Sequence, residues 1–210
     1  MRRDSIAHLP TMLGATARTV PPGVVAMSVL AVAPAVMTAV TGGHDFANAL
    51  SAASVIAGSA VGYAVDDPAA PTLASSPTTL AVRRGMRALL IVAVVLIAWS
   101  VALLVADRYG TSSADVGALA GELCATAAVS AAIASRARTD ASVSTGAVAA
   151  AGALLIVVTI SAFAYHWPAL PAIGRAQSHH RWWLIAGLGL AIAAWSSRDP
   201  AARFARARRA

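Results

Sequence analysis

Lysine is absent from this chain of 210 residues, and cysteine is nearly so. A Walker A loop needs a lysine to reach the nucleotide phosphates, so the chain cannot bind ATP in that way. The single cysteine, Cys124, excludes a disulfide within the chain. The G-x-S-x-G, H-E-x-x-H and C-x-x-C patterns are missing as well, and the sequence therefore argues against an enzyme and against a bound cofactor.

Charge is also scarce. Only 12% of the residues are charged and 58% are hydrophobic, and the mean hydropathy of +0.70 lies outside the usual range for a soluble domain. Apolar runs of roughly 20 residues recur, which is the length needed to cross about 30 Å of hydrocarbon. They cover Gly23–Val40, Phe46–Val65, Ala88–Ala106, Val116–Ser135, Gly146–Tyr165 and Trp182–Ser197, the last being the shortest. None alternates as barrel strands do, so we expect an all-α membrane protein with a six-helix transmembrane bundle.

The basic residues, all 16 of them arginine, indicate an orientation. With the N-terminus in the cytoplasm, every arginine except Arg108, Arg175 and Arg181 falls on the cytoplasmic side. The positive-inside rule therefore predicts that both termini are cytoplasmic. We attribute the net charge of +7 to topology and to contact with anionic lipids of a cell membrane rather than to nucleic acid.

Three segments are expected along the chain. Residues 1–22 form a cytoplasmic leader that can lie at the interface as an amphipathic helix, although a frayed basic tail is the alternative. Residues 23–197 form the six-span domain, and residues 198–210 form a basic cytoplasmic tail. Trp182 and Trp183 are expected in the outer aromatic belt, whereas Trp99 falls in the middle of a span.

Small residues recur at four-residue steps within the spans. Gly58 and Gly62 follow Ser54 in the second run, and Gly117 and Gly121 lie in the fourth. Because lipid provides no hydrophobic drive between helices, small faces that allow close backbone approach mark helix packing. The pattern does not decide whether these contacts lie within one chain or between two.

Glu122 is the only ionisable residue well inside a run. A carboxylate at this depth costs a few kcal/mol unless it is paired or hydrated, so Glu122 is a candidate for the translocation path of a transporter. Alternatively, it reaches water at the outer interface or bonds a hydroxyl such as that of Ser100 or Thr126. Histidines also gather on the predicted outer side, but their spacing fits no standard metal site, and we expect no bound metal. These histidines are His44, His166, His179 and His180.

The connection between the second and third runs reads DDPAAPTLASSPTTLAVRRGMR and is the longest predicted cytoplasmic loop. Asp67 is a candidate N-cap with Pro68 at the first helical position, and Pro77 ends the short helix. Arg87, with the arginines before it, is expected to hold the following span at the lipid headgroups. A solvated linker is the alternative reading.

This loop, together with six spans and cytoplasmic ends, resembles the small membrane permeases of actinobacterial ABC-2-type export systems. The resemblance implies a bacterial plasma-membrane permease without its own ATPase, paired with an identical or homologous second permease subunit, and docked through this loop on cytoplasmic ATP-binding subunits. The coupling residues it implies are Asp66, Asp67, Pro68, Pro71 and Pro77. The segment before the last span departs from the family, because it is polar and interrupted by proline.

The expected function is thus an ATP-driven exporter permease whose cargo is amphipathic or lipid-like, given the nearly uncharged interior. Two alternatives remain open. One is the substrate-binding membrane component of an ABC-type importer, and the other is a membrane scaffold or assembly protein that transports nothing.

Overall fold

The computed structural model describes residues 20–42, 46–64, 80–109, 115–136, 145–164, 166–167, 170–173 and 178–196. Within these ranges the chain is helical and has no strand. The helices are α3 (Pro22–Val40), α4 (Phe46–Ser59), α5 (Leu80–Tyr109), α6 (Val116–Arg136), α7 (Thr145–Phe163) and α8 (His179–Ser196), and a 3₁₀ segment, η1 (Ala60–Ala64), continues α4. The expectation of an all-α protein is confirmed for this part of the chain.

Helix boundaries follow local sequence chemistry. Proline occupies the first position of α3 at Pro22, where its fixed φ suits a helix start. At the start of α6, the Asp115 carboxylate accepts hydrogen bonds from the backbone N–H groups of Gly117 (2.9 Å) and Ala118 (3.2 Å), which makes it the N-cap. The start of α5 at Leu80 lies about two turns before the expected one, because the arginines in between are good helix formers.

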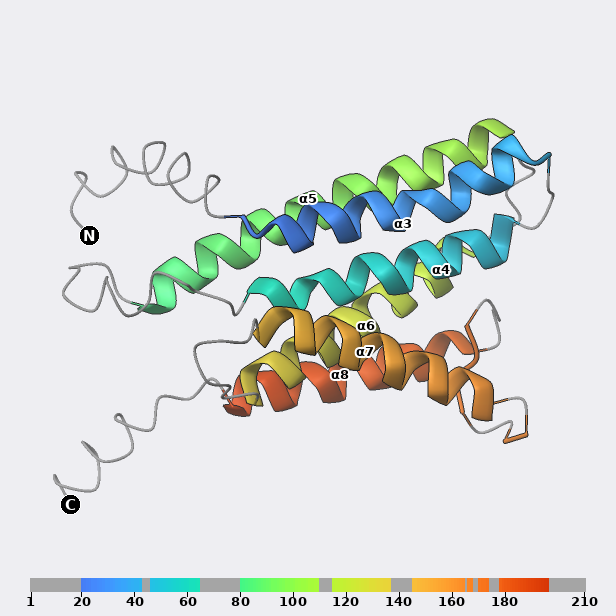
Figure 1. Cartoon of the computed structure of the whole chain (residues 1–210). Coiled ribbons are helices and arrows are strands. Elements are labelled where there is room, and N and C mark those ends of the chain that lie inside the picture. Colours follow the sequence, from blue (N-terminus) through green and yellow to red (C-terminus); the bar gives the residue numbers. More distant parts are fainter. Residues whose placement is uncertain are drawn as a thin grey trace, which may run out of the picture.

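Successive helices run in opposite directions, as Figure 1 shows. The first residues of α3, α5 and α7 and the last residues of η1, α6 and α8 lie at one end of the bundle, here called the Pro22 end. The opposite end, where α4, α6 and α8 begin, is called the Asp115 end. Consequently α4 and α6 run parallel to each other. The orientation of these two ends relative to a membrane remains a prediction.

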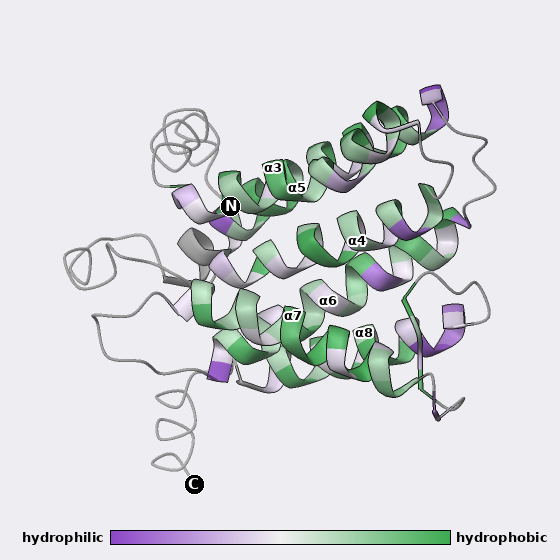
Figure 2. Ribbon diagram, turned by 45° about the vertical axis from the view of Figure 1, so that its right-hand side comes forward, coloured by the Kyte–Doolittle hydropathy of each residue, from purple (hydrophilic) through white to green (hydrophobic). Residues whose placement is uncertain are grey.

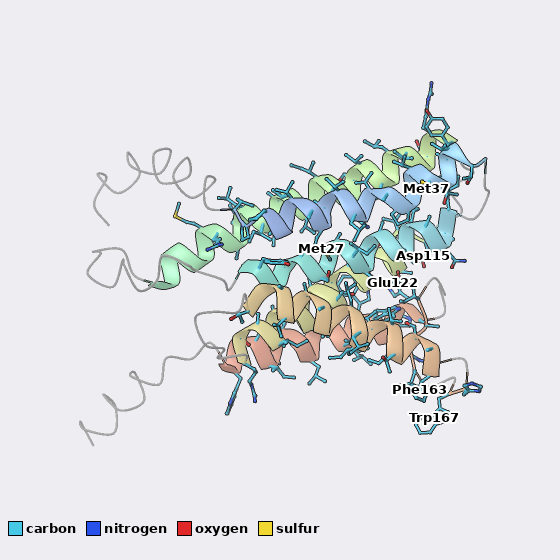
Figure 3. All side chains as sticks on the ribbon, in the orientation of Figure 1. Met27, Met37, Asp115, Glu122, Phe163 and Trp167 are labelled. Carbon is cyan, nitrogen blue, oxygen red and sulfur yellow. The ribbon has the colours of Figure 1, made fainter. Side chains whose placement is uncertain are left out.

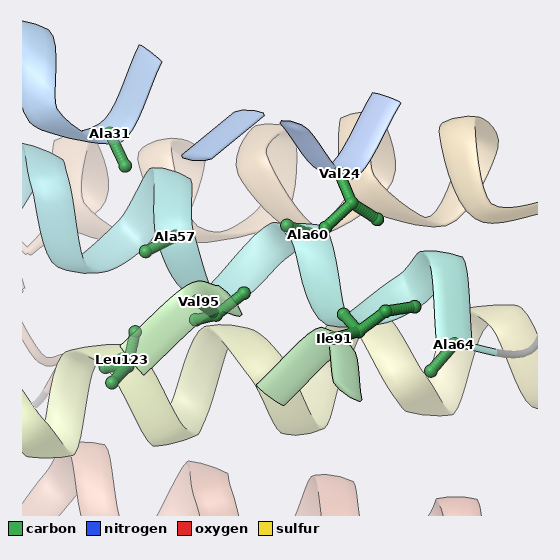
Figure 4. Close-up of a cluster of buried hydrophobic side chains, with 8 residues drawn as sticks. All are labelled: Val24, Ala31, Ala57, Ala60, Ala64, Ile91, Val95 and Leu123. Atoms are coloured by element: carbon green, nitrogen blue, oxygen red, sulfur yellow. The ribbon is translucent and has the colours of Figure 1, made fainter. Parts of the chain in front are cut away.

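The helices are not equally buried. Within their most apolar stretches, α4 with η1 is 67% buried and α6 is 56% buried, against 22% for α3, 22% for α5 and 28% for α7. On one side of this inner pair α3 packs on α4 and α5, and on the other α7 and α8 pack on α6. A cluster of α3, α4, η1, α5 and α6 side chains fills the space between the first group and the inner pair (Figure 4).

Large apolar side chains cover the outside of the bundle instead of its centre. They include Val29, Leu30, Leu89, Ile97, Leu155, Leu184 and Leu188. In Figure 2 the helix surfaces are mainly hydrophobic, and hydrophilic residues gather toward the helix ends. Soluble monomers rarely expose apolar area on this scale, so this surface indicates contact with lipid.

Five of the six helices in the described part of the chain are long and apolar enough to cross a membrane, namely all but α8. The chain is therefore a helical protein with the properties of a multi-pass membrane protein. Helix α8 begins with His179, His180 and Arg181, which lower its hydropathy. A sixth crossing at α8 stays a prediction from the sequence.

Candidate functional site: a buried glutamate beside the inner helix pair

Glu122 lies on α6, about two turns after the helix start, and its side chain is 1% exposed. Figure 3 labels it within the bundle, while Phe163 and Trp167 project at the outside. The alternative that Glu122 reaches water at the outer interface is therefore wrong. Burial of a carboxylate in a low-dielectric interior is costly, and this makes Glu122 the leading functional candidate among the described residues.

The turn of α6 that carries Glu122 is enclosed from two sides. A side chain on Gly121 would meet Trp182 and Trp183 of α8, each 3.3 Å from the position of its Cβ. On the other side, a Cβ on Gly58 of α4 would lie 2.5 Å from the Leu123 carbonyl oxygen. Both glycines therefore let a neighbouring helix approach the segment around Glu122.

Further along, a serine hydroxyl joins the inner pair. Ser130 of α6 donates a hydrogen bond to the backbone carbonyl of Ser59 (2.7 Å). A Cβ on Gly62 would collide with the Ser130 hydroxyl and would lie 3.0 Å from Ala149 of α7. The glycine faces read from the sequence are thus occupied within one chain, including that of Gly117, which faces the His179 imidazole.

Neither hydroxyl suggested as a partner of the Glu122 carboxylate bonds it. Thr126 donates to the backbone carbonyl of Glu122 (2.8 Å), one helical turn earlier, as threonine commonly does in membrane helices. Ser100 lies on the exposed face of α5. The structure thus describes no carboxylate bond to either hydroxyl.

Three buried polar atoms near the Asp115 end have no hydrogen-bond partner among the described residues. They are the Ser51 hydroxyl of α4, the Trp182 indole nitrogen and the His179 Nδ1 of α8. Trp182 packs with Val55, one turn after Ser51, and beside Gly121. Buried polar atoms therefore gather in the same part of the bundle as Glu122. A buried donor or acceptor without a hydrogen bond destabilises the fold by about 1–3 kcal/mol.

The aromatic belt expected from the sequence is only partly right. Trp182 is 0% exposed and packs against Val55, Ala125, Val157 and Ala186, so its assignment to the membrane interface is wrong. Trp183, next in the chain, is 43% exposed. Because successive residues of a helix point about 100° apart, Trp182 turns into the bundle, whereas the Trp183 indole reaches Gly121 of α6 with its Nε1 edge and stays partly exposed.

The sequence analysis did not predict the burial of Arg87. Its side chain is 5% exposed, although it was expected at the lipid headgroups. The signal was present, because Arg87 continues the helical spacing of the buried α5 residues Ile91, Val95, Ala98 and Ala102.

Trp99 lies in the middle of a span, a position that the aromatic belt did not explain. Its indole N–H donates a hydrogen bond to the Ser54 hydroxyl (2.8 Å).

The histidines of α8 do not assemble a metal site with the described residues. The rings of His179 and His180 meet edge to face with centroids 5.2 Å apart, and no group of three His, Cys, Asp or Glu side chains gathers in the described ranges. His44 lies outside those ranges.

The residues that were predicted to couple to an ATPase also lie outside the described residues. Asp66, Asp67, Pro68, Pro71 and Pro77 all fall between Ala64 and Leu80. Both flanking residues lie at the Pro22 end, so the connection begins and ends there (Figure 1). No family model, curated protein or solved structure matches the chain.

Proposed function

We propose that the chain is the membrane-spanning permease subunit of an ATP-driven exporter, which takes its energy from separate ATP-binding subunits. The observation that carries the proposal is the continuity between the connection after Ala64 and the inner helix pair. That connection follows η1 directly, and η1 packs on α6 and α7. It also contains the paired acidic residues Asp66 and Asp67 in an otherwise uncharged stretch.

The contacts of η1 and α4 supply a mechanical route from the connection to Glu122. The Ser130 to Ser59 hydrogen bond and the close approach at Gly58 tie α4 to α6, and η1 packs on α6 as well. A force on residues 65–79 would therefore move α4 and α6 together, because close-packed interiors shift as units rather than deform continuously. Glu122, placed on α6, would then change its surroundings and exposure during transport.

The experiment removes both acidic groups in Asp66→Ala with Asp67→Ala. The tagged chain is first purified from its native cells, and the copurifying ATP-binding subunit is identified by mass spectrometry. We expect the double variant to lose that subunit, or to keep ATP hydrolysis while losing transport. Asp140→Ala, in the other predicted cytoplasmic connection, is the matched control. Wild-type retention and coupling in the double variant would remove the proposed role of the loop.

The compact seam between α4 and α6 favours a second candidate, a membrane scaffold or assembly protein. Glu122 lines neither the groove between α6 and α8 nor the groove between α3 and α5. Glu122→Gln separates the two functions, because it keeps the volume and removes the charge. An exporter should lose transport while the protein stays folded, whereas a scaffold should keep its partners and its activity unchanged.

A further inference from the structure

A groove of about 650 Å³ runs along the outside of α6 and α8 near the Pro22 end. Its apolar walls come from Val129, Ala132, Ile133, Ile185, Leu188, Gly189 and Ile192. Arg136, the last residue of α6, is the only charged residue among the described residues that line it. The groove is therefore apolar along its length and carries a positive charge at one end.

The length of the groove fits within one leaflet of a bilayer. On α6 its lining extends from Val129 to Arg136, about 10 Å at 1.5 Å per residue. One leaflet contributes about 15 Å of hydrocarbon. Trp195, one turn after Ile192 on α8, is 58% exposed and suits the headgroup level at this end. Arg136, exposed at the same end, lies where a lipid phosphate would be.

We propose that this groove is a binding site for an anionic phospholipid. One acyl chain lies along the apolar walls and the phosphate meets the Arg136 guanidinium. Arginine suits the phosphate because its planar fork can donate two hydrogen bonds to it. The groove forms because α8 approaches α6 closely at Gly189, where a Cβ would lie 2.9 Å from Ala128. The larger side chains on either side of this contact form the walls of the groove. The proposal does not depend on ATP-driven export.

A second groove provides the internal comparison. It measures about 530 Å³ and lies between α3 and α5, lined by Val25, Ser28, Val29, Val32, Ala33, Val36, Val94, Ile97 and Ala98. Its described lining residues carry no charge. It can therefore hold an acyl chain but has no means of selecting a headgroup.

The experiment measures lipids retained by the full chain, purified in detergent, using native mass spectrometry. Phosphatidylglycerol and phosphatidylcholine with the same acyl chains are added in equal amounts. We expect Arg136→Gln to lower the ratio of bound phosphatidylglycerol to phosphatidylcholine about fivefold, which corresponds to about 1 kcal/mol for one cation near an anionic surface. Arg108→Gln, an exposed arginine at the Asp115 end, is the charge-matched control and should leave the ratio unchanged.

A second pair of variants tests the apolar part. Leu188→Trp fills the proposed groove, and Val29→Trp fills the other one at a position of similar exposure, 67% against 64% for Leu188. We expect Leu188→Trp to remove the preference for phosphatidylglycerol and Val29→Trp to keep it. Should Leu188→Trp not elute as a monodisperse particle, Ile192→Phe provides the same test.

The proposal is overturned by an unchanged lipid ratio in Arg136→Gln, by an equal loss in Arg108→Gln, or by equal effects of the two tryptophan variants. Inorganic phosphate, added in excess, distinguishes a lipid site from a simple anion site. Displacement of the bound lipid by phosphate alone would show that the acyl chain contributes nothing, which also contradicts the proposal.

Discussion

The inner helices, α4 with η1 and α6, and the outer helices α3, α5, α7 and α8 solve different packing problems. The inner pair meets through glycine, serine and alanine, with Gly58 against the Leu123 carbonyl and Ser130 against the Ser59 carbonyl. The outer helices turn Val, Leu and Ile outward. In water the large apolar side chains would be gathered inside. In lipid they gain nothing by association, so small residues and hydrogen bonds occupy the centre.

The sharpest way to break this contrast is Gly58→Ala in the inner pair. Its Cβ would lie 2.5 Å from a backbone oxygen, which cannot move as a flexible side chain would. We expect a loss of about 2 kcal/mol in the free energy of unfolding, within the range for overpacked cores. Unfolding in mixed detergent micelles, followed by circular dichroism, measures it.

Gly187→Ala on α8 is the matched control, because among the described residues no atom outside its own stretch of α8 lies within 4 Å of its Cβ position. Here alanine should be neutral or stabilise the helix by up to about 1 kcal/mol. Equal effects of the two substitutions would mean that the inner pair is not packed as closely as described.

The next effect concerns the polar link between an outer and an inner helix. Trp99→Phe removes the indole N–H that α5 donates to Ser54 of α4. We expect a loss of about 1 kcal/mol, typical of one hydrogen bond in a folded protein. The thermal midpoint in detergent should fall accordingly. Trp167→Phe, at a 68% exposed position, is the control and should stay within experimental error. A larger loss in the control than in Trp99→Phe would contradict the role of the bond.

The smallest expected effect is that of Ser130→Ala. It deletes the hydrogen bond to the Ser59 carbonyl between α6 and the end of α4 while keeping the small volume that Gly62 requires. Interhelical hydrogen bonds in membrane proteins average about 0.6 kcal/mol, and we expect a loss of that size. Ser100→Ala, at an exposed position of α5, serves as reference. A loss above 2 kcal/mol would make this bond, rather than glycine packing, the main link of the seam.

The helices themselves were predictable from the sequence. The first residues of α4 and α6 agree with the apolar runs, and α3 starts one residue earlier than expected, at a proline. The sequence also distinguishes the inner pair, because α4 with η1 and α6 have the lowest mean hydropathy of the five candidate spans among the described residues. Glu122 was found because a carboxylate is conspicuous among apolar residues, whereas the burial of Arg87 was missed because its neighbours in sequence suggested a headgroup anchor.

Composition and the length of the apolar runs alone determined that this chain is helical and suited to a membrane, because every backbone polar group in lipid must be satisfied within its own segment. Only the tertiary structure decided which faces meet. It placed Trp182 inside, joined Trp99 to Ser54, and left a groove beside Arg136. These outcomes depend on contacts between residues far apart in the chain, which hydropathy, as a property of single residues, does not encode.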